Sequence, residues 1–310
     1  MITTISLSPA IDKRLEFETF SIGGTNRVVH SEAEGAGKAV NVALAAQALG
    51  LSAHCAGILP GSGQLITERL SRFGVAYDFL PAPGNVRVNQ KLFDRSTQVL
   101  TEMNESCPPV NDALLDEAAA HAVDCAKKSD YLVLTGSLPP KCPVDWYASV
   151  LRRIHAKAPA CRVVLDAEGK RFSAAVEEKP WLVKPNQYEL GLFAGRPLDT
   201  QEDILAAARA VLRRGVEVVV VSMGSRGALA VRGDEAVFVP GLKLHVVTTV
   251  GAGDSMVAGL LRGFSERDDL RWALRCGTAS ASARCVYAGA GYLDSAVFAE
   301  MLEKTVAQDL

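Results

Sequence analysis

Short β-branched and apolar runs alternate with longer helical patterns along this chain, and this alternation constrains the fold more than any other feature. Strands that are separated by helices pair in parallel through βαβ units. The pattern predicts buried strands over residues 2–7, 131–135, 163–166, 181–184 and 217–222. It predicts helices over residues 39–49, 65–73, 112–127, 145–155 and 204–214. The fold class is therefore α/β, with a mostly parallel central sheet.

Composition excludes several classes of protein. A chain of 310 residues that is 48% hydrophobic can bury one large core. Its net charge of −2 gives no basic field, so nucleic acid is not an expected partner. No apolar run approaches the length of a membrane span and no leader pattern opens the chain, so we expect a cytoplasmic protein without a membrane partner. The seven cysteines are scattered without a C-x-x-C pair, which favours reduced thiols.

Two stretches break the α/β rhythm. Residues 14–29 and 86–103 alternate polar and apolar side chains with period two. This alternation predicts strands of a small sheet that packs on one face. Such an appendage at the carboxyl edge of a parallel sheet is naturally a lid, and its other face could be buried against a second subunit. We expect one domain over 1–310, with a lid formed from about 12–35 and 86–105.

A small-residue turn near the C-terminus carries the clearest chemical signal. A β-branched extended run over 246–250 stops at Gly251-Ala252-Gly253, and Asp254 follows where a helix begins. Glycines and a helix start let backbone N–H groups converge on an anion. A carboxylate beside such a cradle suits phosphoryl transfer to an alcohol. By itself, the same segment is more often an ordinary turn with an aspartate N-cap, and the surrounding context reverses that balance.

Two commoner nucleotide-binding motifs are excluded. Gly251-Ala252-Gly253 is not a dinucleotide fingerprint, because Met256 occupies the third glycine position. Gly37-Lys38 is not the end of a Walker A loop, because Ala39 replaces the hydroxyl that holds magnesium. A Rossmann dehydrogenase would also need a glycine fingerprint after the first strand, and residues 7–10 contain none.

Cations and amides recur in the predicted lid and next to it. In a strand, Arg87, Asn89 and Lys91 lie on one face, which suits a phosphate ester, although the face could simply be solvated. Lys38 falls in the first turn of a helix, with Asn41 one turn later. A cation is unfavourable at that position unless an anion sits there, so both residues are substrate-contact candidates.

Further polar residues follow predicted strands. Asp12 comes after the first strand, where open α/β sheets bind ligands, and its carboxylate suits sugar hydroxyls. Asn186 and Glu189 are three residues apart and could orient magnesium through its waters, or could form a capping box, or both. The loop at 222–227 is punctuated by glycines and would allow ATP phosphates to approach closely.

Taken together, these segments resemble the ribokinase-like (PfkB) carbohydrate kinases almost from end to end. The segment 249–255 is similar to the family's C-terminal signature, 37–41 to its N-terminal signature, and 184–189 to its magnesium-associated motif. The resemblance implies a ribokinase-like three-layer core, a four-stranded lid, and often a homodimer through the lids. Arg27, Lys38 and the strand Arg87-x-Asn89-x-Lys91 resemble the branch that acts on phosphorylated ketohexoses, which includes 1-phosphofructokinase and tagatose-6-phosphate kinase.

The expected reaction is then ATP- and Mg²⁺-dependent phosphorylation of a sugar phosphate, with fructose 1-phosphate giving fructose 1,6-bisphosphate. Tagatose 6-phosphate and fructose 6-phosphate are alternative substrates. The resemblance implies Asp254 as base and the amides of Gly251, Ala252 and Gly253 as anion hole. It implies ATP contacts at Lys184, Ser222, Gly224, Ser225, Gly227 and Gly253, and magnesium at Asn186 and Glu189. The implied substrate contacts are Asp12, Arg27, Gly37, Lys38, Asn41, Arg87, Asn89, Lys91 and Ser137.

The chain departs from the family pattern at a few positions. Ala36 and Ala39 replace glycines around the lysine, and a Cβ at 36 is expected to restrict a positive-φ conformation and reshape the sugar end. Ser8 replaces a usual asparagine, and Thr248 stands where Asp or Asn is typical. Lys141 stands where a glycine is common. The altered glycines at Ala36 and Ala39 motivate a different-class alternative, a non-catalytic sugar-phosphate sensor on a kinase scaffold. Retention of Asp254 argues against the sensor, which needs no base.

Overall fold

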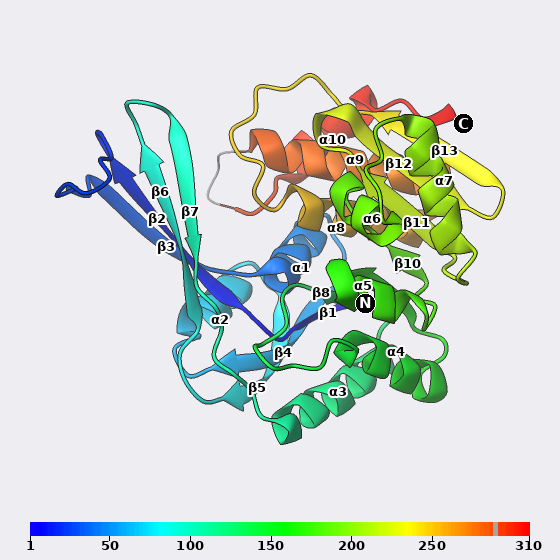
Figure 1. The fold of residues 1–310 in the computed structure, drawn as a ribbon, viewed down its shortest axis with the longest axis horizontal. Helices are drawn as coiled ribbons and strands as arrows, with labels where there is room; N and C mark the ends of the chain where they lie inside the picture. Colours follow the sequence, from blue (N-terminus) through cyan, green and yellow to red (C-terminus); the bar gives the residue numbers. More distant parts are fainter. Residues whose placement is uncertain (288–290) are drawn as a thin grey trace.

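A ten-stranded sheet forms the centre of the computed structural model, which describes residues 1–287 and 291–310 (Figure 1). Seven neighbouring strands run parallel, and three antiparallel strands extend one edge. The parallel strands, in spatial order, are β5 (Ala76–Ala82), β4 (Ala53–Pro60), β1 (Ile2–Ser6), β8 (Tyr131–Thr135), β9 (Arg162–Asp166), β10 (Leu182–Val183) and β11 (Val218–Ser222). The antiparallel strands are β12 (Gly227–Arg232), β13 (Glu235–Pro240) and β14 (Gln308–Asp309).

Helices cover both faces of this sheet, so the core has three layers. One apolar cluster joins the sheet to α3 (Asp112–Ala126), α4 (Trp146–Lys157), α5 (Gly169–Val176), α6 (Gln187–Ala194) and α7 (Gln201–Leu212). A second cluster lies on the opposite face with α1 (Lys38–Ala48), α2 (Gln64–Arg72), α8 (Ala252–Glu266), α9 (Leu270–Val286) and α10 (Ser295–Lys304). The predicted α/β class with a mostly parallel sheet is thereby confirmed.

The central strands are buried on both faces, which is why they read as continuous apolar runs. Ile2 of β1 belongs to one cluster and Ile5 to the other, and Val133 and Leu134 of β8 divide in the same way. Each fully buried aliphatic side chain of this kind contributes about 1.5–3 kcal/mol. The two-sided core fixes the strand ends, and with them the loops that carry polar residues.

A separate four-stranded sheet projects beside the carboxyl edge of the core (Figure 1). Its order is β3 (His30–Ala36), β2 (Ala10–Phe17), β6 (Arg87–Asp94) and β7 (Val99–Asn104). β2 pairs parallel with β6, which sets Asp12 opposite Asn89. The alternation expected over 14–29 persists as strand only to Phe17, because residues 18–29 form the connection to β3.

The sequence pattern predicted one segment wrongly and gave no prediction for several strands. Residues 246–250 are not a strand: the amide of Val247 donates to the carbonyl of Cys285 at 2.8 Å, and no sheet neighbour is present for this segment among the described residues. β4, β5 and the β12–β13 hairpin were not predicted. None of the helices within residues 1–287 and 291–310 has both the length and the apolar character needed to cross a membrane.

Candidate active site

A polar cavity of about 680 Å³ lies between the carboxyl edge of the large sheet and the small sheet. Strand ends, the starts of α1 and α8, and one face of β6 all contribute to its wall. Most of the residues singled out in the sequence line it: Asp12, Gly37, Lys38, Asn41, Arg87, Asn89, Lys91, Ser137, Lys184, Asn186, Glu189, Ser222, Gly224, Gly251, Gly253 and Asp254.

Four of the predicted site residues do not line this cavity. Arg27 is exposed in the connection between β2 and β3. Ser225 is exposed in the short 3-10 turn over Gly224–Arg226, and Gly227 begins β12 behind it. Ala252 is the first residue of α8, where its amide donates to the carbonyl of Thr249 at 3.2 Å.

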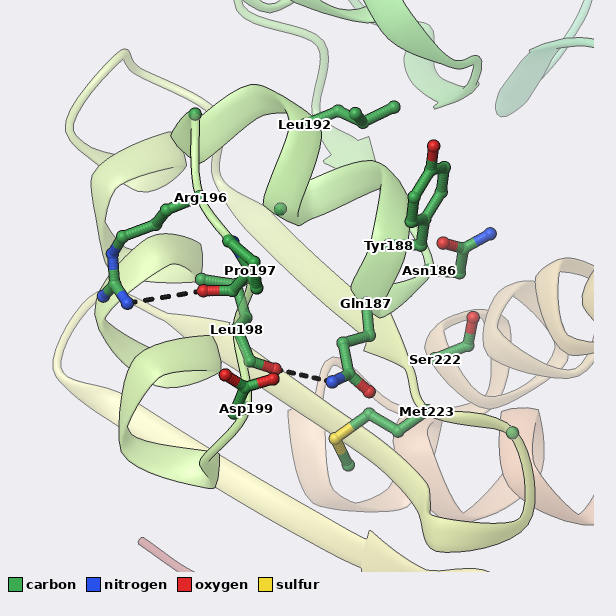
Figure 2. Close-up of a pocket in the computed structure, with 13 residues that line it drawn as sticks. Asn186, Gln187, Tyr188, Leu192, Arg196, Pro197, Leu198, Asp199, Ser222 and Met223 are labelled. Carbon is green, nitrogen blue, oxygen red and sulfur yellow. Dashed lines mark hydrogen bonds between the residues drawn. The ribbon is translucent and has the colours of Figure 1, made fainter.

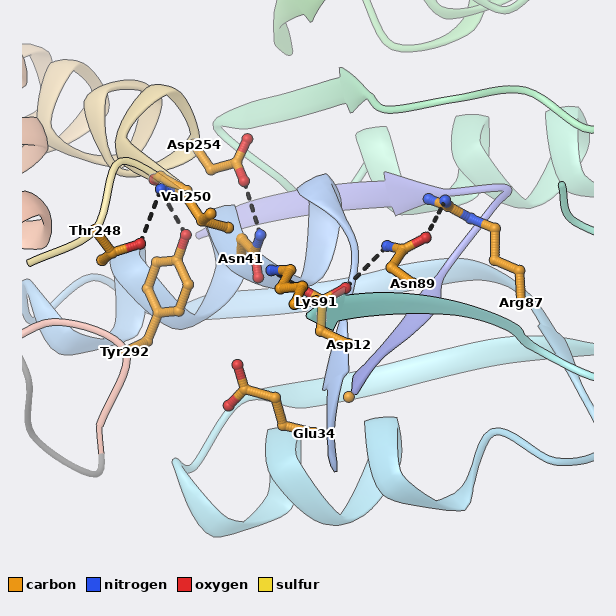
Figure 3. Close-up of polar contacts among 12 residues, drawn as sticks. Asp12, Glu34, Asn41, Arg87, Asn89, Lys91, Thr248, Val250, Asp254 and Tyr292 are labelled. Atoms are coloured by element: carbon orange, nitrogen blue, oxygen red, sulfur yellow. Dashed lines mark hydrogen bonds and ion pairs between the residues drawn. The ribbon is translucent and has the colours of Figure 1, made fainter. Parts of the chain in front are cut away.

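Asp254 lies in the first turn of α8, with a side chain that is almost fully buried. Its carboxylate accepts a hydrogen bond from the Nδ2 of Asn41 at 2.8 Å (Figure 3). Burial, followed by the negative charge of Asp166, raises the pKa of Asp254 to about 6, although Lys38 and Asn41 oppose the shift. The group therefore remains ionised near neutral pH and is a better proton acceptor than an ordinary aspartate.

An anion cradle is formed by the turn before Asp254. Gly251 caps α8 with φ +78°, a left-handed conformation that favours glycine. Over the part of the chain that the structure describes, no acceptor receives the amides of Gly251, Gly253 or Asp254. The donors available to an anion are therefore those three amides, and the Ala252 amide expected among them is used within the turn.

Asp166 organises the positive side of the cavity. Its carboxylate lies 3.3 Å from the Nζ of Lys38 and 3.3 Å from the Nζ of Lys184, and it accepts from the Thr135 hydroxyl at 2.9 Å. Burial opposes its ionisation, but the two ammonium groups outweigh burial and hold the pKa of Asp166 below its usual value. Sequence reasoning assigned it no role, and its only sequence signal was its position at a strand end.

The small sheet presents a connected set of polar side chains. Asp12 accepts from the Nδ2 of Asn89 at 2.8 Å and forms an ion pair with Lys91. Asn89 in turn accepts from Arg87 at 2.9 Å (Figure 3). The strand face expected to bind a phosphate ester thus also holds the carboxylate expected to bind hydroxyls, because β2 and β6 are neighbours.

Asn186 and Glu189 form the capping box of α6. The Oδ1 of Asn186 accepts from the Glu189 amide at 2.8 Å, and the Oε2 of Glu189 accepts from the Asn186 amide at 2.8 Å. One carboxylate oxygen remains toward the cavity. Burial raises the pKa of Glu189. Within the described ranges, no cluster of three His, Cys, Asp or Glu side chains could hold a metal ion alone.

The substituted glycines affect the backbone differently from the expectation. Ala36 pairs with Ala10 inside the β2–β3 ladder and has no positive φ, so its Cβ causes no strain. The positive φ belongs to its neighbour Gly37, at +121°. Lys141 does adopt φ +67° where the family commonly has glycine, at a cost of about 1 kcal/mol.

A second pocket, of about 670 Å³, lies across the β11 end from this cavity (Figure 2). It shares Asn186, Ser222 and Gly224 with the cavity and is bordered by α6 and the segment that follows it. Tyr188 and Leu192 are exposed at its edge. The segments 184–189 and 222–227, both singled out in the sequence, contribute residues to its wall.

An open α/β sheet, a polar lid and a buried carboxylate beside free helix-start amides define a phosphotransferase of ribokinase-like fold. The chain belongs to the pfkB family of carbohydrate kinases, whose family model matches residues 9–296. It is therefore an ATP-dependent kinase.

Two relatives and one solved structure show the extent of the similarity. The 1-phosphofructokinase of Bacillus subtilis (strain 168) is 33% identical over 284 residues, which covers 91% of this chain and 92% of that protein. The 1-phosphofructokinase of Escherichia coli (strain K12) is 31% identical over 308 residues, covering 99% and 98%. The crystal structure of phosphofructokinase-2 from Escherichia coli in complex with potassium has a TM-score of 0.90 at 26% identity, covering 98% of each chain.

Proposed function

We propose that this protein transfers the terminal phosphoryl group of ATP to fructose 1-phosphate and produces fructose 1,6-bisphosphate. One observation carries the proposal: Asp254 and the open amides of Gly251 and Gly253 face the same cavity as the lid residues Asp12, Arg87 and Lys91. A base and an anion cradle at one end, and cations with a carboxylate at the other, fit a sugar that already bears a phosphate. The names of the relatives described above support the same substrate.

Asp254 acts as the general base in this proposal. A carboxylate cannot deprotonate a free hydroxyl in advance, so proton transfer occurs late, as the phosphoryl group reaches the sugar oxygen. The amides of Gly251 and Gly253 and the ammonium of Lys184 stabilise the charge on the transferring group. Asn41 holds the Asp254 carboxylate in place through its 2.8 Å hydrogen bond.

The lid residues bind the sugar phosphate. Asp12 accepts from sugar hydroxyls, and the same carboxylate fixes Asn89 and Lys91. Arg87, Lys91 and Lys38 supply the positive charge for the existing phosphate. The lid excludes water, which would otherwise compete for the phosphoryl group.

The donor set fits magnesium that is held mainly by water and nucleotide phosphates. Glu189 keeps one carboxylate oxygen free of the capping box and facing the cavity, with the Asn186 side chain beside it. Magnesium retains much of its hydration and needs only one or two protein carboxylates. When bound, it would neutralise charge on the phosphates.

The test is turnover of fructose 1-phosphate, fructose 6-phosphate, tagatose 6-phosphate and free fructose side by side, measured as ADP release. We expect kcat/KM to be at least about tenfold higher for fructose 1-phosphate, since one correctly placed charge-assisted contact contributes about 1.5–3 kcal/mol. Faster use of either 6-phosphate would reassign the substrate. Binding of both ligands without ADP release would instead indicate a sensor.

A further inference from the structure

Tyr292 touches the catalytic turn from a distant part of the chain. Its phenol donates a hydrogen bond to the carbonyl of Gly251 at 3.1 Å (Figure 3). The same carbonyl accepts from the Ser255 amide at 2.9 Å, which is the first helical bond of α8. The phenol therefore adds a second donor to the peptide on which the helix starts.

The phenol also occupies the space that a side chain at position 251 would need. A Cβ built on Gly251 would come within 2.0 Å of the Tyr292 hydroxyl. Together with the φ of +78°, this leaves glycine as the residue that fits. The turn and the tyrosine are complementary in shape as well as in hydrogen bonding.

The ring itself is held firmly. Tyr292 is only 4% exposed, and the guanidinium groups of Arg284 and Arg69 lie 4.9 and 5.8 Å from its ring centre. Arg69 is fixed by the carbonyl of Gly35 at 2.6 Å and the carboxylate of Glu34 at 2.7 Å, both in the lid strand β3. A buried ring with two cations close to it has little freedom to move.

We propose that Tyr292 is a positioning residue for phosphoryl transfer. It fixes the Gly251–Ala252 peptide, so that the amides of Gly253 and Asp254 and the Asp254 carboxylate stay aimed at the reacting groups. Tyr292 does not line the cavity that holds Asp254, so it acts on that cavity through the turn. This inference rests on the function proposed above.

Another tyrosine gives an internal comparison at the sugar end. Tyr147 is buried and donates to the carbonyl of Gly136 at 2.9 Å, and Gly136 also has a positive φ, +96°. Gly136 precedes the predicted substrate contact Ser137. Loss of each phenol should therefore disturb a different kinetic parameter.

The experiment compares Tyr292→Phe, Tyr147→Phe and Tyr77→Phe in the full chain with fructose 1-phosphate and ATP. Tyr292→Phe should lower kcat about three- to tenfold, with KM for the sugar phosphate unchanged. Tyr147→Phe should mainly raise that KM. Tyr77→Phe is the control, because Tyr77 is a half-exposed residue on the distant β5 and should leave both parameters unchanged.

A second variant, at Gly251, tests whether the effect of Tyr292 depends on its contact with the turn. Gly251→Ala leaves the phenol in the chain but displaces it, so its kcat loss should not add to that of Tyr292→Phe in the double variant. A kcat within twofold of wild type for Tyr292→Phe, or fully additive losses, would overturn the role of Tyr292. If wild type itself fails to use fructose 1-phosphate, the proposed function fails instead, and the tyrosine variants are compared on whichever sugar phosphate is turned over.

Discussion

Four neighbours and burial determine how the Asp254 carboxylate behaves. Burial and Asp166 make its charge less favourable, whereas the Asn41 amide and the lysines keep the charge from being lost at neutral pH. The result is a carboxylate whose proton affinity suits a late proton transfer.

Asp254→Asn should lower kcat by roughly 10²–10⁴, the range for loss of a positioned general base. The Asn41 contact can be kept by the new amide oxygen, so fructose 1-phosphate should still bind. Steady-state kinetics and calorimetric titration of the sugar phosphate measure the two effects. Near-normal turnover in this variant would remove Asp254 from the mechanism.

Activity should fall on the acid side. Because burial raises the pKa of Asp254 to about 6, the ionised base is present above that pH and is lost as the pH drops through it. We expect kcat/KM to decline about tenfold per unit well below pH 6. A phosphate monoester also titrates near pH 6, so direct infrared titration of Asp254, with Asp254→Asn as blank, is the control. A carboxylate titrating near 4 would contradict the expectation.

The lid strands show how elements place residues. The parallel pairing of β2 with β6 brings Asp12 beside Asn89, and the adjoining ion pair of Asp12 with Lys91 then forms across the same two strands. Neither contact is visible from one strand alone. Substitutions in the lid should therefore act through the pair of strands.

Lys91→Ala should weaken use of fructose 1-phosphate roughly tenfold or more, by loss of one charge-assisted contact. It also leaves the Asp12 carboxylate without its cation. KM for fructose 1-phosphate is the measurement, and free fructose, which has no phosphate, is the comparison substrate. Lys157→Ala is the control, because Lys157 is an exposed lysine at the end of α4 and does not line the cavity. Equal effects on both sugars would argue against a phosphate contact.

The local sequence predicted those strands that are buried on both faces and those helices whose start is set by a capping residue. β8 has the expected bounds, and Asn111 caps α3 by accepting from the Leu114 amide at 2.8 Å. Residues 246–250 misled the prediction because β-branched residues favour extended backbone, whether or not a neighbouring strand is available. The edge strand β5 and its neighbour β4 were missed.

The difference between local and long-range contacts also explains which site residues could be predicted from the sequence. Asp254 was predictable because its turn and helix start are contiguous in the sequence. The roles of Asp166 and Tyr292 depend on strand order and on a contact across 41 residues, and no local pattern encodes either. Whether Arg27 contacts substrate stays a prediction, since it lies away from the cavity of its own chain.

At the scale of the whole molecule, we propose that two copies pair through their lids. Val99 and Met103 lie on the strand face of β7 opposite the cavity, and their side chains are 53% and 47% exposed. Val28 and Val29, which directly precede β3 in the sequence, are also exposed. Apolar side chains on a partly uncovered sheet suit a self-complementary interface.

Light scattering should therefore give the mass of a dimer for the wild type. The double substitution Val99→Glu with Met103→Glu should shift it to a monomer, because four charges would be buried at a two-fold interface. Thermal unfolding checks that the variant is folded. If a second copy brings Arg27 to the cavity, the monomer should also bind fructose 1-phosphate less well. A wild-type monomer would refute the proposal.

The groups that bind the sugar phosphate and the groups that carry out phosphoryl transfer stand on different sheets, and this separation has an evolutionary consequence. Asp12, Arg87, Asn89 and Lys91 stand on the small sheet, whereas Asp254, Lys184 and the Gly251 turn stand on the core. Mutations can therefore alter which carbohydrate is accepted without disturbing the groups that handle the nucleotide. Proteins that evolve from such a scaffold can therefore gain new sugar substrates while the phosphoryl-transfer step stays the same.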